Sequence, residues 1–239
     1  GLVSVGQQAF VGFGGYLLFA LTMFAAVNPL VAIPLSGIFG ALISLPIAFL
    51  IFRLRGAYFA IGTWVVAEVF RLTFAQIQSL GGGSGSSLPV GIVKSIASSK
   101  VMRESIIYWM ILGLTVLIII SVYFILRSRR GIALIAIRDN ELASESLGIN
   151  IIKSKLFVYI ITSGLTTILG SLIFLQKLRI SPDAAFNVND WTAFVIFIVV
   201  IGGIGTIEGP IIGVLVFFAI RETLADLGSA YLIMLGFVA

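Results

Sequence analysis

Three stretches of this chain each run for more than twenty residues without a charged side chain. They cover residues 30–52, 106–126 and 156–176, which are 23, 21 and 21 residues long. At a rise of ~1.5 Å per residue, a 21-residue helix reaches roughly 32 Å, enough to cross a hydrocarbon core of about 30 Å. The runs therefore predict several membrane-spanning helices.

The composition agrees with a chain that lies largely inside a membrane. Charged residues make up 10% of the sequence and hydrophobic residues 59%, with a mean hydropathy of +1.17. A soluble domain carries about 25% charged residues, so this chain has too little polar surface to cover a soluble core. A membrane β-barrel would show short alternating segments instead. We predict an all-α, multi-pass transmembrane helical bundle.

Two residue types that often carry chemistry are missing altogether. The sequence holds neither cysteine nor histidine, which excludes disulfides, thiolate metal sites, histidine-ligated metals and histidine general bases. We expect neither a metal nor a cofactor. The net charge of +5 comes from basic residues at the ends of apolar segments, so it indicates membrane topology and not nucleic-acid binding.

Full-length apolar segments are followed by shorter ones. We predict membrane helices near 9–27, 30–52, 57–79, 106–126 and 156–176. Two runs of about half a bilayer follow at 191–201 and 211–220, and an apolar run extends from residue 231 to the end. The chain begins without methionine and ends inside an apolar run. We therefore interpret 1–239 as a single transmembrane domain that belongs to a longer polypeptide.

The short pair 191–220 has two interpretations. Each run is a tilted span lengthened by its neighbours, or the pair is a re-entrant hairpin that turns within the membrane. Non-helical backbone at that depth needs a cover of protein or a watery cavity. Glycine breaks occur at both ends of the chain, in "VSVGQQAFVGFGG" and "GGIGTIEGPIIG", and paired interrupted segments are typical of transport paths. We favour the hairpin, and expect glycine-interrupted or re-entrant segments.

Orientation follows from the distribution of lysine and arginine. The loops 53–56 and 127–155 together hold eight basic residues, whereas the loops 80–105 and 177–190 hold five. Because the more basic loops of a membrane protein stay in the cytoplasm, we place 127–155 there and the Gly/Ser-rich stretch "LGGGSGSSLP" outside.

A polar island interrupts the cytoplasmic loop at residues 138–151. Asp139 and Asn140 are good N-caps, Glu141 suits a first helical turn, and Gly148 suits the left-handed position after a C-terminus. These signals predict a two-turn helix over 141–147 with a few exposed apolar side chains. Its apolar residues are Leu142, Ala143 and Leu147. The pattern alone fits a docking element for another protein or a plain solvated loop.

A family resemblance bears on that choice. The segment "RRGIALIAIRDNELASESLGINIIKSKL" resembles the cytoplasmic loop of ABC importer permeases, which carries an E-A-A-x-x-x-G pattern and docks on an ATPase subunit. The pattern falls on Leu142, Ala143, Ser144 and Gly148, with leucine in place of the leading glutamate and Ser144 in place of the second alanine. That departure is typical of one branch of the family, the permeases of branched-chain amino acid importers. Four other segments resemble the same branch: "VSVGQQAFVGFGGY", "RGAYFAIGTWVVAEVFR", "ISPD" and "GGIGTIEGPIIG".

The resemblance implies a function and a set of partners. It implies an inner-membrane permease that receives a branched-chain amino acid from an external binding protein. Separate cytoplasmic ATP-binding subunits would drive transport through residues 139–149, and a second permease subunit, identical or related, would complete the path. Related importers carry urea, sugars or nucleosides, so another small solute is an alternative substrate. An ion-coupled secondary transporter that uses Glu68 is a second alternative.

Polar residues within the membrane segments are candidates for the translocation path. Glu68 and Arg71 lie near mid-bilayer in the 57–79 segment, one helical turn apart, so they can pair on one face. They either meet the zwitterionic head of an amino acid or form an ion pair that fixes helix packing or tethers neighbouring helices. The candidates are Gln7, Gln8, Thr63, Glu68, Arg71, Gly205, Thr206 and Glu208.

Other small-residue patterns indicate packing and not chemistry. Ser163, Thr167 and Ser171 repeat every four residues, which predicts a close-packing helix face. The stretch "GGIGTIEGP" fails the G-x-G-x-x-G fingerprint at Glu208, and G-x-x-x-x-G-K-[ST] is absent, so this chain does not bind ATP through a P-loop. With a single intramembrane acid–base pair, a membrane-embedded enzyme is a poor fit.

The predicted topology can be checked with single cysteines. Ser144→Cys should resist an impermeant thiol reagent in intact cells, and Ser86→Cys should react, because the first lies in the cytoplasmic loop and the second outside. Both should react after the membrane is permeabilised. Labelling of Ser144→Cys but not of Ser86→Cys in intact cells would reverse the topology.

Overall fold

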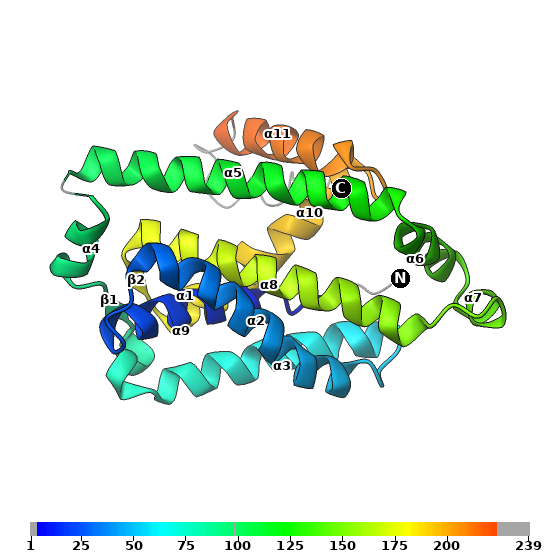
Figure 1. The fold of residues 1–239 in the computed structure, drawn as a ribbon, viewed down its shortest axis with the longest axis horizontal. Coiled ribbons are helices and arrows are strands. Elements are labelled where there is room, and N and C mark those ends of the chain that lie inside the picture. The colour runs from blue at the N-terminus through cyan, green and yellow to red at the C-terminus, as the bar shows by residue number, and fades with distance from the viewer. Residues whose placement is uncertain (1–3, 98, 224–239) are drawn as a thin grey trace. The chain divides into compact units, whose positions relative to one another are not determined.

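The computed structural model describes residues 4–97 and 99–223 and is almost entirely helical (Figure 1). Two compact units divide the chain, residues 1–187 and 188–239. The apolar run from residue 231 lies outside the described residues. The first unit contains α1 (Gln8–Met23), α2 (Pro29–Ile51), α3 (Ala57–Gln76), η1 (Gln78–Leu80), η2 (Gly82–Ser84), β1 (Ser86–Ser87), α4 (Val90–Ile96), α5 (Lys100–Arg127), α6 (Arg129–Asp139), α7 (Glu141–Ser146), α8 (Ile151–Lys177), β2 (Arg179–Ile180) and α9 (Pro182–Ala185).

Five helical segments of the described chain are long and apolar enough to cross a membrane. They are Pro29–Ile51, Ala57–Gln76, Lys100–Arg127, Ile151–Lys177 and Pro182–Gly202. The first four coincide with predicted spans, which confirms the multi-pass helical fold. The predicted span at 9–27 is shorter than expected, because α1 ends at Met23 and the backbone turns through Ala26 at a φ of +50°.

A small β pair adds to the helical fold in the region predicted to lie outside. β1 and β2 pair antiparallel, with Ser86 opposite Ile180 and Ser87 opposite Arg179. This pair ties the Gly/Ser-rich loop after α3 to the C-terminal end of α8. The sequence patterns did not predict it, since two-residue strands leave no hydrophobic period to detect.

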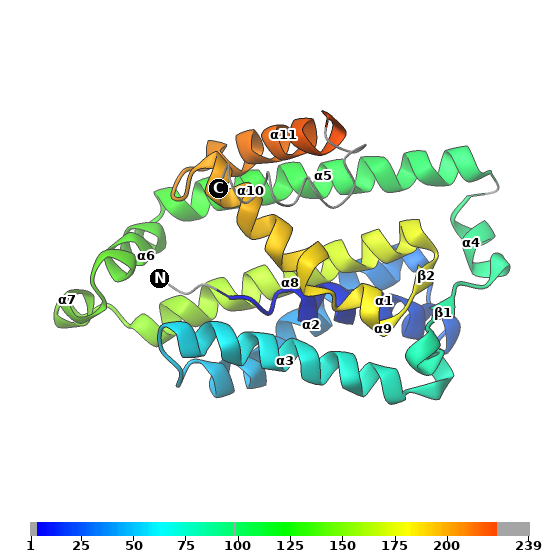
Figure 2. The ribbon, with the colours of Figure 1, turned by 180° about the vertical axis from the view of Figure 1, so that it is seen from behind.

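The helix α8 packs tightly against α1 and α2, and Figures 1 and 2 show the three side by side. A Cβ on Gly14 of α1 would meet the Thr167 carbonyl, and one on Gly170 of α8 would meet the Val11 carbonyl. The Ser171 hydroxyl lies 2.9 Å from the carbonyl oxygen of Gly14 and 2.6 Å from the Ser36 hydroxyl. Ser163, Thr167 and Ser171 are fully buried. The predicted close-packing face is confirmed.

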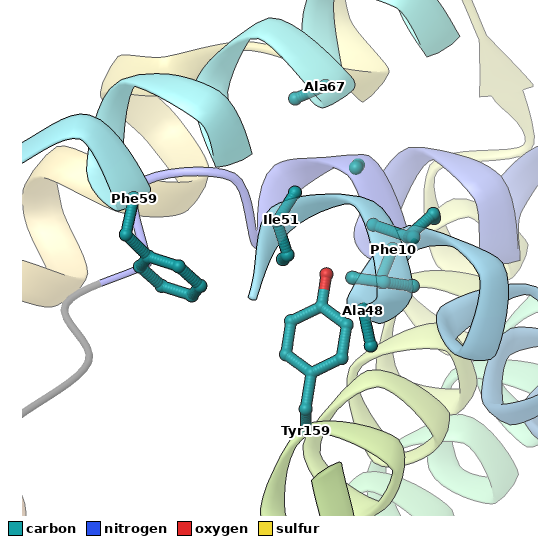
Figure 3. Packing of buried hydrophobic residues seen from close by; sticks show 8 residues of the cluster. Phe10, Ala48, Ile51, Phe59, Ala67 and Tyr159 are labelled. Carbon is teal, nitrogen blue, oxygen red and sulfur yellow. The ribbon is translucent and has the colours of Figure 1, made fainter. Parts of the chain in front are cut away.

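An apolar cluster joins the same helices to α3 (Figure 3). Phe10 meets Tyr159 edge to face, with ring centroids 5.8 Å apart. Phe59 of α3 and Ile51 of α2 are buried in the same cluster. The cluster therefore fixes α3, which carries Glu68 and Arg71, onto the bundle formed by α1, α2 and α8.

The second unit contains η3 (Asn189–Ala193), α10 (Phe194–Gly202) and α11 (Glu208–Thr223). Cβ atoms on Gly209 and Gly213 would meet the carbonyls of Gly203 and Ile198, so glycines bring α10 and α11 close together as an antiparallel pair. The short apolar run 191–201 joins the residues before it in a candidate span of 21 residues, Pro182–Gly202. That length suits a span lengthened by its neighbours, the alternative to the hairpin that we favour from the sequence. A re-entrant turn at this pair stays a prediction.

The glycine contacts of α8 give a test of the packing. Gly14→Ala and Gly170→Ala should each lower the stability of the protein in detergent by about 1–3 kcal/mol, because the added methyl meets backbone that cannot move aside. Gly113→Ala on α5 is the matched control, since nothing lies within 4 Å of its Cβ position. Denaturant unfolding followed by circular dichroism measures the difference. Equal stability of all three variants would contradict the packing.

Candidate functional site

The helix α7 begins and ends with the capping geometry that its sequence predicts. Asn140 is the N-cap, and its Oδ1 accepts a hydrogen bond of 3.0 Å from the Ala143 amide. At the other end, Gly148 adopts a φ of +82°, and its amide donates to the Glu145 carbonyl. The helix runs from Glu141 to Ser146, so Leu147 is its C-cap and not its last residue.

Asp139 has a different place from the one predicted. It is the last residue of α6, and its carboxylate lies 3.1 Å from Nε of Arg138. The Asn140 side chain alone caps α7. The two candidates are adjacent in sequence and chemically equivalent as caps, so local pattern could not separate them.

The side chains of α7 divide into one that faces the protein and several that face outward. Ser144 is 2% exposed, and its hydroxyl donates a hydrogen bond of 2.8 Å to the Asn140 carbonyl. Because a buried cysteine resists labelling from either side, the exposed Ser146→Cys is the better cytoplasmic position for the topology test. Leu142 is 77% and Leu147 79% exposed, and Ala143 is exposed between them. The helix thus presents a small apolar surface outside the fold, as a docking element would.

An ion pair attaches α7 to the start of α8. The Nζ of Lys155 lies 2.6 Å from Oε1 of Glu141. Asn150 caps α8 by accepting from the Lys153 amide at 2.9 Å. In Figure 1, α7 lies at the end of the unit where α6 finishes and α8 begins. Since α8 is the packing centre of the first unit, a displacement of α7 has a direct connection to the membrane helices.

A cleft of about 460 Å³ lies between α7 and the loop that joins α2 to α3. Leu142 and Glu145 line it from α7, and Arg55 and Gly56 line it from the loop. Gly56 has a φ of +56° and open space at its Cβ position. The two loops predicted to be cytoplasmic therefore meet at the same end of the first unit.

The structure places the backbone just before Gln7 and Gln8 against Thr63, and all three residues are candidates for the path. The Val5 amide donates to the Thr63 hydroxyl at 3.1 Å, and the backbone at Gly6 packs directly on Thr63. Gln8 is fully buried and Thr63 is 2% exposed. The start of α1 and the first half of α3 thus form one small polar contact.

Glu68 and Arg71 do pair, and Arg71 has a second carboxylate partner. Its Nη2 lies 2.6 Å from Oε1 of Glu68, and its Nη1 lies 2.8 Å from Oδ1 of Asp183. Asp183 follows Pro182 in the first turn of α9. The guanidinium therefore joins α3 to α9, which favours the tethering interpretation of the pair.

Asp183 is a site residue that the sequence reasoning missed as a partner. It is 112 residues away from Arg71 in sequence, so spacing carried no signal. The available signal was a charge count. The Arg71 guanidinium offers five donors, more than one carboxylate can accept, and "ISPD" places a carboxylate shortly after the end of α8.

The remaining path candidates belong to the second unit and shape its turn. Thr206 accepts a hydrogen bond of 3.0 Å from the Gly209 amide through its hydroxyl, and Glu208 opens α11. Gly205 has a φ of +100°. These contacts account for the threonine and the glycine as turn-forming residues. Among the described residues, no group of three or more Asp or Glu side chains is placed to hold a metal.

Comparison with known proteins shows which family the chain belongs to. The family described as "Branched-chain amino acid transport system / permease component" matches residues 1–238. The chain belongs to this family. The family resemblance read from the polar island and the glycine motifs is therefore confirmed.

Three curated relatives are similar over most of this chain. The LivM permease protein of the high-affinity branched-chain amino acid transport system of Escherichia coli is 26% identical over 99% of this chain, and that of Salmonella typhimurium 27% over 99%. A probable LivM permease protein from Methanocaldococcus jannaschii is 27% identical over 87%. The chain spans 60% to 62% of the length of these relatives. No solved structure matches it.

The contacts of Arg71 predict how three variants rank in folded yield. Glu68→Gln should lower the folded yield, because it leaves Arg71 with the exposed Asp183 as its only carboxylate partner, and an incompletely paired charge in a membrane segment is costly. Glu68→Gln with Arg71→Gln should recover much of that yield. Asp183→Asn should have a milder effect, since Arg71 keeps Glu68. Size-exclusion chromatography in mild detergent measures the yield.

Transport separates the two roles of this group. If the residues tether helices, the double variant should both fold and transport. A double variant that folds normally and fails in uptake would place Glu68 and Arg71 on the path instead. Normal yield in every single variant, with normal uptake, would contradict both roles.

Proposed function

We propose that this chain is a membrane-spanning permease subunit of an ABC importer in the inner membrane, and that it translocates branched-chain amino acids. An external binding protein delivers the substrate, and separate ATP-binding subunits supply the energy. The observation that carries the proposal is α7, a short capped helix whose apolar side chains are exposed at the end of the fold. The family and the curated relatives support the substrate class.

Coupling would work through the mechanical connection of α7. Six residues are too few for a helix that persists alone in water, so its caps and the Glu141–Lys155 ion pair hold it in place. Leu142 and Ala143 fill a groove on the ATPase subunit. When ATP closes the ATPase subunits, the displacement of α7 passes to α8. From there it reaches α1 and α2 through the close glycine contacts.

The path itself requires a second permease subunit, identical or related. The described interior of the first unit is filled by side chains of α1, α2, α3 and α8, so the route is proposed to lie at the interface of two subunits whose bundles open alternately to either side. A permease of another small solute, such as urea, uses the same architecture. Binding of a panel of amino acids and urea to the cognate external protein distinguishes the two.

An ion-coupled secondary transporter is the second candidate, and the geometry of Glu68 argues against it. Both carboxylate oxygens of Glu68 lie within 3.0 Å of the Arg71 side chain. A carboxylate that takes up and releases a proton during transport needs to leave such a partner. Uptake that continues without an ATPase subunit would favour this candidate over the ABC permease.

Two substitutions in the 139–149 segment test the proposal. Ala143→Glu should block docking, because it places a bulky charge in the apolar contact. Gly148→Val should displace the helix end, since a valine in the left-handed region costs about 1–2 kcal/mol. Both should leave insertion intact, abolish ATP-driven uptake in liposomes and loosen the ATPase subunit on co-purification.

Conservative changes at the same positions are the controls. Ala143→Ser keeps a small uncharged side chain, and Gly148→Asn keeps a residue that tolerates positive φ, so both should transport normally. Full uptake by Ala143→Glu and Gly148→Val, with the ATPase still bound, would mean that the segment is only a solvated connection.

A further inference from the structure

A groove with apolar walls lies between α5 and α8, away from both candidate sites. Its volume is about 290 Å³. Ile118, Val122 and Ile125 of α5 form one wall, and Phe157, Ile161 and Leu165 of α8 form the other, with Leu134 of α6 at one end. Figures 1 and 2 show α6 joining the end of α5 to the region where α8 begins.

The groove has the height of one membrane leaflet. Its lining covers residues 118–126 on α5 and 157–169 on α8, which at ~1.5 Å per residue are about 12 and 18 Å long. Half of a hydrocarbon core of about 30 Å is roughly 15 Å. A transmembrane helix of another protein would occupy the full height of α5, whereas one acyl chain of a lipid fills this distance.

Basic side chains surround the open end of the groove. Two adjoining hollows share Phe157 with it: one is lined by Arg129 and Arg130, the other by Arg130 and Lys153. The Arg130 guanidinium lies 4.3 Å from the centroid of the Phe157 ring. Arg127 is the last residue of α5, and its guanidinium lies 4.4 Å from the centroid of the Tyr123 ring. The cations therefore sit where the apolar walls end.

These cations have no carboxylate partners in the part of the chain that the structure describes. Ion pairs engage Arg71, Lys100, Arg138 and Lys155 there, but none engages the four residues at the groove. The four are Arg127, Arg129, Arg130 and Lys153, all exposed. Positive-inside topology explains basic residues at this end of a span, but it does not explain an apolar groove that leads into them.

We infer that this groove binds one anionic phospholipid of the cytoplasmic leaflet. An acyl chain lies between α5 and α8, and the headgroup phosphate contacts Arg130 and Lys153, with Arg129 beside them. Basic pockets between transmembrane helices at the cytoplasmic surface suit such headgroups. The inference requires only the membrane embedding of the chain, so it stands apart from the proposed substrate.

The site connects the lipid to the segment proposed for coupling. Lys153 lies in the first turn of α8 and Arg130 in the first turn of α6, the two helices that flank α7. A phosphate held between them fixes the ends of both helices. An anionic leaflet should therefore hold the base of α7 in one position, whereas a zwitterionic leaflet leaves it without this contact.

Photo-crosslinking in nanodiscs tests the site on the assembled transporter. A phosphatidylglycerol analogue with a photoactivatable acyl chain should label peptides from 118–134 and 153–169, and a phosphatidylcholine analogue should label them weakly. Arg130→Gln with Lys153→Gln should weaken binding roughly 30-fold, at about 1 kcal/mol for each basic residue. Lys94→Gln with Lys100→Gln, which removes two charges predicted to lie on the opposite side, should bind like the unchanged protein.

Two further experiments distinguish binding of the lipid's acyl chain from binding of its headgroup. Leu165→Trp keeps every cation and places an indole in the groove, so it should lose the acyl-chain label. Soluble glycerol phosphate should not compete, because it has no chain to bury. Thermal unfolding of each variant in phosphatidylcholine nanodiscs should match that of the unchanged protein, which excludes misfolding as the cause of a lost label.

Three results would overturn the inference. Equal labelling by the two lipid analogues would mean that the groove holds ordinary bulk lipid. Full competition by glycerol phosphate would mean a free anion site. A photoreactive amino acid at Ser121, which lines the groove, should form an adduct with lipid, and an adduct with the second permease subunit would make the groove a protein interface.

Discussion

Close contact between α8 and its two neighbours is the interaction on which the first unit depends. In a membrane the hydrophobic effect does not drive helices together, since lipid chains are as apolar as the side chains they would replace. Association needs backbones that approach closely and polar groups that bond across the interface. Gly14, Gly170 and Thr167 provide the approach, and Ser171 provides a hydrogen bond to the Gly14 carbonyl.

The same helix gives the cytoplasmic end its position. Asn150 caps the start of α8, and Lys155 lies near that start and holds α7 through its ion pair with Glu141. A helix of six residues thereby gains a fixed orientation that its own hydrogen bonds would not provide. The mechanism proposed for coupling uses this arrangement, because a displacement of a rigidly attached helix is transmitted and that of a free loop is not.

Much of this architecture could be predicted because its signals are local. Charge-free runs with the length of a bilayer marked three of the spans, and the fourth, 57–79, stayed recognisable because Glu68 and Arg71 are the only charges in an apolar stretch. Asn140 and Gly148 mark the ends of α7 by their own backbone preferences, and Ser163, Thr167 and Ser171 show their packing face by a period of four. The end of α1 was misplaced, because the residues after Met23 stay apolar while the backbone leaves the helix.

The sequence by itself determined the spans, the capped helix and the packing face, since each rests on residues within one continuous stretch of the chain. The tertiary structure alone decided the contacts between distant residues: Arg71 with Asp183, Lys155 with Glu141, β1 with β2, and the groove between α5 and α8 with its basic end. The physical reason is that ion pairs and grooves depend on how helices are placed in space, and one sequence pattern is compatible with many placements.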